Sequence, residues 1–108
     1  MGGGYGFSEN AIADLDEICS YLGQRNVAVA GKFFDRVRQR CKLAAAFPGM
    51  GKAYEDLIPG MRGVVVDDYL VFYVAMTSGR SSTIAGGIQV LRVISGYRDL
   101  RSVFEMEE

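Results

Sequence analysis

The sequence predicts an α+β fold in which an N-terminal antiparallel helical hairpin packs on a small twisted antiparallel β-sheet. Two successive segments, residues 9–22 and 27–47, repeat apolar side chains every three or four positions, as amphipathic helices do. Residues 61–76 contain two runs of β-branched and aromatic residues on either side of Asp67-Asp68, which is typical of a hairpin. A third such run, residues 88–95, completes the predicted sheet.

Length and composition limit the classes of protein to consider. A chain of 108 residues is long enough for one domain, so we expect residues 1–108 to form a single core. The hydrophobic share of 49% with 23% charged residues is typical of a folded soluble protein. No apolar run approaches the ~20 residues that cross a bilayer, and residues 1–7 do not resemble a signal peptide. We therefore expect a cytoplasmic protein.

The first predicted helix follows a short edge strand at residues 5–7. Ser8 can cap the helix with its hydroxyl group, and Glu9 suits the positive end of the helix dipole. The polar link at residues 23–26 begins with Gly23, which can adopt a left-handed cap. The chain is expected to reverse there.

The second predicted helix ends at Pro48, which cannot continue it. Its periodicity places Phe33, Phe34 and Phe47 in the core. Both cysteines fall on apolar helix faces, and in a hairpin they are offset by roughly 15 Å along the axis. That exceeds disulfide reach, so Cys19 and Cys41 are expected to be reduced core residues.

The remaining segments connect these elements. Residues 50–58 are expected to form an irregular connector, and Pro59-Gly60 a turn before the first long strand. A glycine-rich link spans residues 77–87, and residues 96–104 are expected to form a loop or a final helical turn.

The net charge of -1 conceals an uneven distribution. The first helix is acidic, whereas the second and its surroundings are basic. The basic residues are Arg25, Lys32, Arg36, Arg38, Arg40 and Lys42. They predict either a basic surface for a partner or simply a solvated helix face.

The residue types restrict the chemistry. The chain has no histidine, which removes the commonest general base and the commonest metal ligand. With two separated cysteines and no carboxylate cluster at ligand spacing, we expect no metal site and no cofactor. Residues 49–52 lack the length and the following Ser or Thr of a phosphate loop.

Two kinds of function remain open from composition alone. Arginines could neutralise a phosphate in a nuclease that works by positioning, or they could anchor a protein interface. The candidates for the nuclease are Lys52, Arg62, Arg92, Tyr97 and Arg98, whereas the arginines and the basic helix would form the protein interface. Simpler interpretations stand beside these: a salt bridge for Arg92, a solvated loop position for Lys52, and a turn for Asp67-Asp68.

The order of short motifs along nearly the whole chain resembles the ParE branch of the RelE/ParE superfamily of type II toxin-antitoxin toxins. The motifs are Ser8, Ala11, Asp14-Leu15, Ile18, Tyr21-Leu22, residues 28–34, Leu43-Ala44, Phe47-Pro48, Gly51, and residues 59–62, 69–73, 90–93 and 96–99. The resemblance implies a helical hairpin on a twisted antiparallel sheet. It also implies a cognate antitoxin that wraps a partly disordered segment over the helices and the sheet.

The superfamily contains two activities. RelE-like members are ribosome-dependent mRNA endoribonucleases, and ParE-like members poison DNA gyrase. Arg98 matches one basic catalytic position of the RelE-like members, but Leu70 stands where they often carry arginine. Phe104 stands in place of their C-terminal tyrosine and cannot exchange a proton. These departures favour a gyrase poison without catalysis.

The resemblance therefore predicts a growth-arresting toxin with no catalytic residues. The residues expected to contact a partner, or to hold the sheet in shape, are Arg62, Arg92, Tyr97, Arg98, Arg101 and Phe104. In the RelE-like alternative, the phosphate would be bound by Lys52, Arg62, Arg92 and Arg98. A third hypothesis is a degenerate, non-toxic member. A homodimer or a toxin-antitoxin hetero-oligomer is compatible with each hypothesis.

Overall fold

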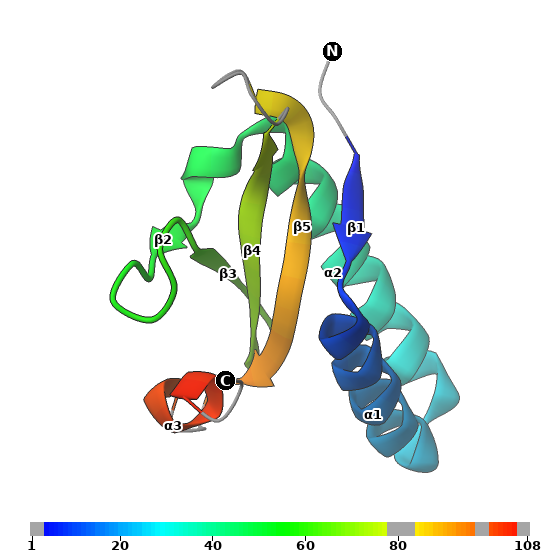
Figure 1. Ribbon diagram of the computed structural model, residues 1–108. Coiled ribbons are helices and arrows are strands. Elements are labelled where there is room, and N and C mark those ends of the chain that lie inside the picture. The colour runs from blue at the N-terminus through cyan, green and yellow to red at the C-terminus, as the bar shows by residue number, and fades with distance from the viewer. Residues whose placement is uncertain (1–3, 78–83, 97–99, 106–108) are drawn as a thin grey trace.

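The computed structural model describes residues 4–77, 84–96 and 100–105 (Figure 1). Its elements are β1 (Tyr5–Phe7), α1 (Glu9–Arg25), α2 (Val27–Ala46), the 3-10 helix η1 (Pro48–Met50), β2 (Lys52–Ala53), β3 (Arg62–Val66), β4 (Tyr69–Thr77), β5 (Ile84–Ser95) and α3 (Leu100–Glu105). Figure 1 shows α1 and α2 side by side along one face of the sheet. The predicted α+β class is confirmed. No helix in the described residues is both long and apolar enough to span a bilayer.

The sheet has five strands in the order β1-β5-β4-β3-β2. β2 to β5 pair antiparallel, as predicted for β3 to β5. β1 pairs parallel to β5, with Tyr5 opposite Ile88, so the sheet is mixed rather than purely antiparallel. The whole helical hairpin and the other strands separate β1 from β5 in the chain, and a crossover of that length permits parallel pairing.

The sheet buries apolar side chains on both faces. Along β4, Val71 and Tyr73 belong to the core that the sheet forms with the two long helices, which also contains Phe33 of α2. Phe72, between them, belongs to a second cluster with Phe104 of α3 on the other face. Successive side chains of a strand point to opposite faces, so β4 contributes residues to a core on each face of the sheet.

The helical hairpin reverses more tightly than the sequence predicted. Ser8 caps α1 as expected, since its hydroxyl oxygen accepts a hydrogen bond from the Ala11 N–H. The helix then continues through Gly23 to Arg25, so the predicted link at residues 23–26 is wrong. Asn26 alone makes the turn: its backbone is extended, its N–H donates to the Leu22 carbonyl, and its side chain caps α2. A left-handed glycine is unnecessary.

Three further predictions require correction. Phe33 is buried, but Phe34 is 39% exposed and Phe47 is 63% exposed. Phe34 is rotated about 100° round the helix from Phe33, and Phe47 lies just beyond the end of α2. β5 begins at Ile84 rather than at Ile88, inside the predicted glycine-rich link. Lys52–Ala53, predicted as part of an irregular connector, forms a strand that is too short to show periodicity.

Both cysteines are free thiols, as predicted. Cys41 is fully buried, and burial raises its pKa from the ordinary 9.0 to about 12. The unfolded chain would release this proton near pH 9.0, whereas the folded chain retains it to about pH 12. The contribution of Cys41 to stability is thus present below pH 9.0 and is lost as the pH rises towards 12.

We expect the free energy of unfolding to fall above pH 9.0 by as much as about 1.4 kcal/mol per pH unit because of Cys41. Urea unfolding curves measured at intervals from pH 8 to pH 10 test this. Cys41→Ala should flatten the slope, whereas Cys19→Ala, at a half-buried site, should change it less. Identical slopes in the two variants would contradict the assignment.

Candidate partner-binding groove

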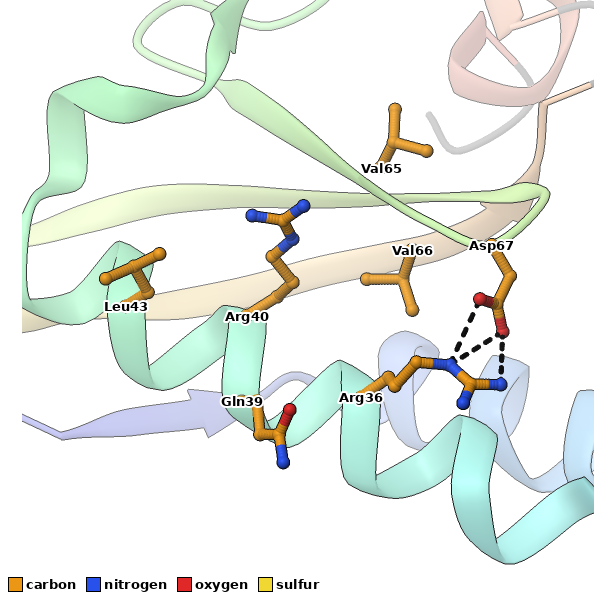
Figure 2. Close-up of a pocket in the computed structure, with 7 residues that line it drawn as sticks. All are labelled: Arg36, Gln39, Arg40, Leu43, Val65, Val66 and Asp67. Atoms are coloured by element: carbon orange, nitrogen blue, oxygen red, sulfur yellow. Dashed lines mark hydrogen bonds and ion pairs between the residues drawn. The ribbon is translucent and has the colours of Figure 1, made fainter.

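A groove of about 390 Å³ runs between α2 and the outer edge of β3 (Figure 2). The side chains that α2 contributes are one turn apart and so share a helix face. The lining residues are Arg36, Gln39, Arg40 and Leu43 from α2, and Val65, Val66 and Asp67 from the β3–β4 hairpin. The groove thus combines cationic and apolar side chains beside an outer strand.

An ion pair closes one end of the groove. Asp67, in the left-handed region at φ 54°, is the first residue of the two-residue turn between β3 and β4. The Arg36 guanidinium binds its carboxylate in a bidentate manner, with Nε 3.1 Å from Oδ1 and Nη2 3.0 Å from Oδ2. The two side chains are 47% and 39% exposed, so the pair stabilises the fold by at most about 1 kcal/mol. Its main effect is to fix the hairpin turn against α2.

The middle of the groove carries a cation without a carboxylate partner. Arg40 forms no ion pair with any residue that the structure describes. Leu43 is 43% exposed and Val65 is 58% exposed, so two apolar side chains lie open beside this guanidinium. Such a combination suits a chain segment that carries both apolar residues and an acid.

Among the described residues, no strand pairs with the outer edge of β3 beyond β2. β2 pairs only with Arg62 and Gly63. The Met61 carbonyl accepts from the Tyr54 N–H on the β2 side, and backbone direction alternates along a strand. The N–H and C=O of Val65 therefore point away from β4, towards the groove. An extended segment could pair there as an added strand.

The groups that line the groove are suited to binding a partner rather than to transferring protons. Guanidinium groups remain protonated and cannot transfer a proton at neutral pH. The carboxylate of Asp67 is already bound by Arg36. Within the described part of the chain, what remains available is backbone hydrogen bonding at Val65, the Arg40 guanidinium, and apolar contact. These groups bind a polypeptide well.

Comparison with known proteins assigns the chain to a family. Residues 5–100 match the family model described as ParE toxin of type II toxin-antitoxin system, parDE. The chain belongs to the ParE toxin family. It is 36% identical over 70 residues to the protein named Toxin ParE1 of Caulobacter vibrioides, an alignment that covers 64% of this chain and 73% of that protein. The predicted family and its toxin function are thereby confirmed.

A solved structure shows the same fold. It is described as the chromosomal ParDE TA system from P. aeruginosa, and it matches with a TM-score of 0.63 and 19% sequence identity. The match covers 85% of this ParE-family chain and 94% of the solved one. At that identity the likeness concerns the arrangement of helices and strands.

Arg62, which was predicted to contact a partner, lies at the β2–β3 edge with Lys52, which was predicted only for the RelE-like alternative. Arg62 donates from Nη1 to the Gly51 carbonyl at 2.7 Å. The Tyr73 hydroxyl holds the same loop, because it accepts from the Gly51 N–H at 3.1 Å and donates to the Pro48 carbonyl at 2.7 Å. Lys52 is exposed, with Nζ 5.4 Å from the Tyr54 ring centroid. In this toxin, Arg62 braces the loop that follows α2.

Arg92 lies across β4 from Arg62, where β5 continues beyond its pairing with β1. Its Nε and Nη2 donate to the two carboxylate oxygens of Asp14, at 2.7 and 2.9 Å. The Val93 N–H donates to the same carboxylate at 2.9 Å. With side chains only 14% and 13% exposed, Arg92 and Asp14 attach α1 to the sheet.

The remaining predicted residues lie near the C-terminal end. Tyr97 and Arg98 lie outside the described residues, and Arg101 is within α3. Phe104 is buried, and its ring stacks edge-on against Phe72 with centroids 5.1 Å apart. That position suits the expectation that it holds the sheet in shape, rather than a direct contact with a partner.

The prediction of individual site residues did not include the groove. The sequence predicts Arg36 and Arg40 as part of a basic helix and Asp67 as a turn residue, but it does not predict that they line one groove. Two signals could have pointed to the groove. Arg36 and Arg40 have helical spacing of four, and Val65 is an outward-facing apolar residue between two buried valines on a strand near the sheet edge.

Proposed function

We propose that this ParE-family toxin arrests growth in the cytoplasm by binding and poisoning DNA gyrase, and that a cognate antitoxin holds it inactive. The match of residues 5–100 to the ParE family carries the proposal. A solved relative in fold is described as a ParDE TA system, which supports an antitoxin partner. We expect the two proteins to form a hetero-oligomer.

The groove beside β3 is the proposed docking site for the antitoxin. An extended antitoxin segment would pair with the open N–H and C=O of Val65 and would cover its exposed side chain. An apolar residue would contact Leu43, and an acidic residue would bind Arg40. A free strand edge favours unwanted association, so a covering segment also protects the toxin in the complex.

Gyrase binding without catalysis is favoured over RelE-like cleavage by where the described arginines lie. Phosphate neutralisation in a transition state needs cations that converge on one point. Arg62 is bound to the Gly51 carbonyl near β2, and Arg92 is bound to Asp14 beneath α1. Their strands lie on either side of β4, and each guanidinium is directed to its own partner within the toxin rather than to a shared point. We therefore propose Arg62, Arg98 and Arg101 as contacts with gyrase, and Arg92 as a residue that maintains the fold.

We expect the purified chain to inhibit supercoiling by DNA gyrase and to trap the cleaved enzyme-DNA complex. Arg98→Ala should weaken inhibition several-fold through loss of a charged contact at the interface. Arg38→Ala is the matched control, because Arg38 is 54% exposed on α2 and pairs only loosely with Asp35 at 3.5 Å.

Unchanged supercoiling with wild-type chain would exclude gyrase as the target. Primer extension on mRNA from cells that express the chain distinguishes the alternative, since position-specific cuts support only a ribosome-dependent endoribonuclease. Equal inhibition by Arg98→Ala and Arg38→Ala would contradict the proposed contact.

A further inference from the structure

A second cavity, of about 380 Å³, lies where the tip of the helical hairpin meets the β3–β4 turn. Three aromatic residues line it: Tyr21 of α1, Phe33 of α2 and Tyr69 of β4. Asp67 and Asp68 of the turn also line it. Aromatic rings combined with carboxylates are the surroundings that favour an organic cation over water.

Of the three aromatic side chains, Tyr21 is exposed and Tyr69 is half-buried, whereas Phe33 is buried and supports the Tyr69 ring. Phe33 and Tyr69 pack with ring centroids 5.1 Å apart. Tyr21 is 52% exposed, and the Arg25 guanidinium lies 5.4 Å from its ring centroid. This toxin thus already pairs a guanidinium with one of these rings. Arg25 itself does not line the cavity.

The carboxylate of Asp68 is available to an incoming cation. Asp67 is neutralised by Arg36, but the Asp68 side chain has no ion pair with the residues that the structure describes. The pKa of Tyr69 is raised first by burial, and the negative charge of Asp68 raises it further.

The cavity adjoins the groove proposed for the antitoxin: Asp67 lines both, and its ion pair with Arg36 stands between them. Asp68 lies three positions after Val65, a path of at most about 10 Å along the chain. A segment paired with Val65 would therefore bring a residue three or four positions away to the cavity. Arg40 lies in the groove at the other side of the Arg36–Asp67 ion pair, so the two sites select opposite charges.

We propose that this cavity receives an arginine side chain of the antitoxin, three or four residues from the one that pairs with Val65. The guanidinium stacks on the accessible tyrosine rings and binds Asp68. Arginine fits better than lysine because its planar group both stacks and forms a bidentate pair with a carboxylate. The choice of partner rests on the proposed function; the chemistry of the cavity does not.

The cavity is tested first without any antitoxin. N-acetyl-arginine amide is titrated into the full, free chain, and the amide resonances of Tyr21, Asp68 and Tyr69 are followed by NMR. We expect saturable shifts, weakened about tenfold in Asp68→Asn, since asparagine keeps the turn but loses the charge. N-acetyl-citrulline amide, which has nearly the same shape without the charge, should give no saturable shift. Equal shifts with both compounds, or an unchanged Asp68→Asn, would overturn the site.

The partner is tested next with the protein encoded in the adjacent reading frame. Its affinity for Asp68→Asn should fall about tenfold, and its affinity for Glu55→Gln should not change. Glu55 is an exposed carboxylate in the connector after β2 and serves as the matched control. Complete absence of binding to the wild-type chain would count against the proposed function, while the arginine titration still reports on the cavity. Binding that is unaffected by Asp68→Asn would overturn the antitoxin arginine.

Discussion

Asp14→Ala is expected to lower the free energy of unfolding by about 3–5 kcal/mol, although Asp14 lies on a helix whose outer face is acidic. Its carboxylate accepts three hydrogen bonds, two from the Arg92 guanidinium and one from the Val93 N–H. Both side chains of the ion pair are nearly buried. Truncation would remove the counter-charge of a desolvated guanidinium and the acceptor of a strand N–H, and both losses are costly.

Urea unfolding of the purified variant measures the loss. Asp16→Ala is the control, because Asp16 is an exposed carboxylate on the same helix and should change stability by less than about 0.5 kcal/mol. A comparable loss in both variants would mean that the acidity of α1, rather than this ion pair, stabilises the fold. Asp14→Ala/Arg92→Leu should recover part of the loss, since no buried charge then remains without its counter-charge.

The sequence predicted the strands and helices better than it predicted what joins them. The β3–β4 hairpin is a local feature: apolar residues flank two aspartates that accept a tight turn, and Val66 pairs with Tyr69 as expected. The Asp14–Arg92 ion pair joins residues 78 positions apart. It depends on β1 pairing parallel to β5 and then turning into α1, which no periodicity reveals.

The candidate groove was hidden for the same reason. A basic stripe on α2 and a turn at Asp67 were each visible in the sequence. That Arg36 meets Asp67 follows only from how α2 packs on the hairpin. The exposed edge at Val65 follows from β2 being two residues long, too short to cover the rest of β3. The types of residue could thus be predicted from the sequence, but which of them lie together could be seen only in the tertiary structure.

Val65→Pro is expected to weaken binding of the antitoxin at least tenfold. Proline has no N–H to donate to an added strand, and its ring occupies the space beside the open edge. The fold should tolerate the change. The pairing of β3 with β4 uses the backbone of Val64 and Val66, whereas the Val65 N–H points towards the groove. Calorimetric titration with the antitoxin measures the affinity, and thermal unfolding checks the fold.

Val65→Thr is the matched control, since threonine keeps the N–H and the β-branched shape. It should bind the antitoxin within a few-fold of wild type. Wild-type affinity in Val65→Pro would show that no strand is added at this edge. Loss of affinity in both variants would point instead to the valine side chain as the main contact.

The same variant separates neutralisation from toxicity. If the antitoxin acts by covering the β3 edge, and gyrase is contacted elsewhere, Val65→Pro should remain toxic while it escapes its antitoxin. Cells that carry both genes should then stop growing with Val65→Pro and grow with Val65→Thr. Growth in both cases, with a folded Val65→Pro that still inhibits supercoiling in vitro, would mean that the antitoxin holds the toxin through a different surface.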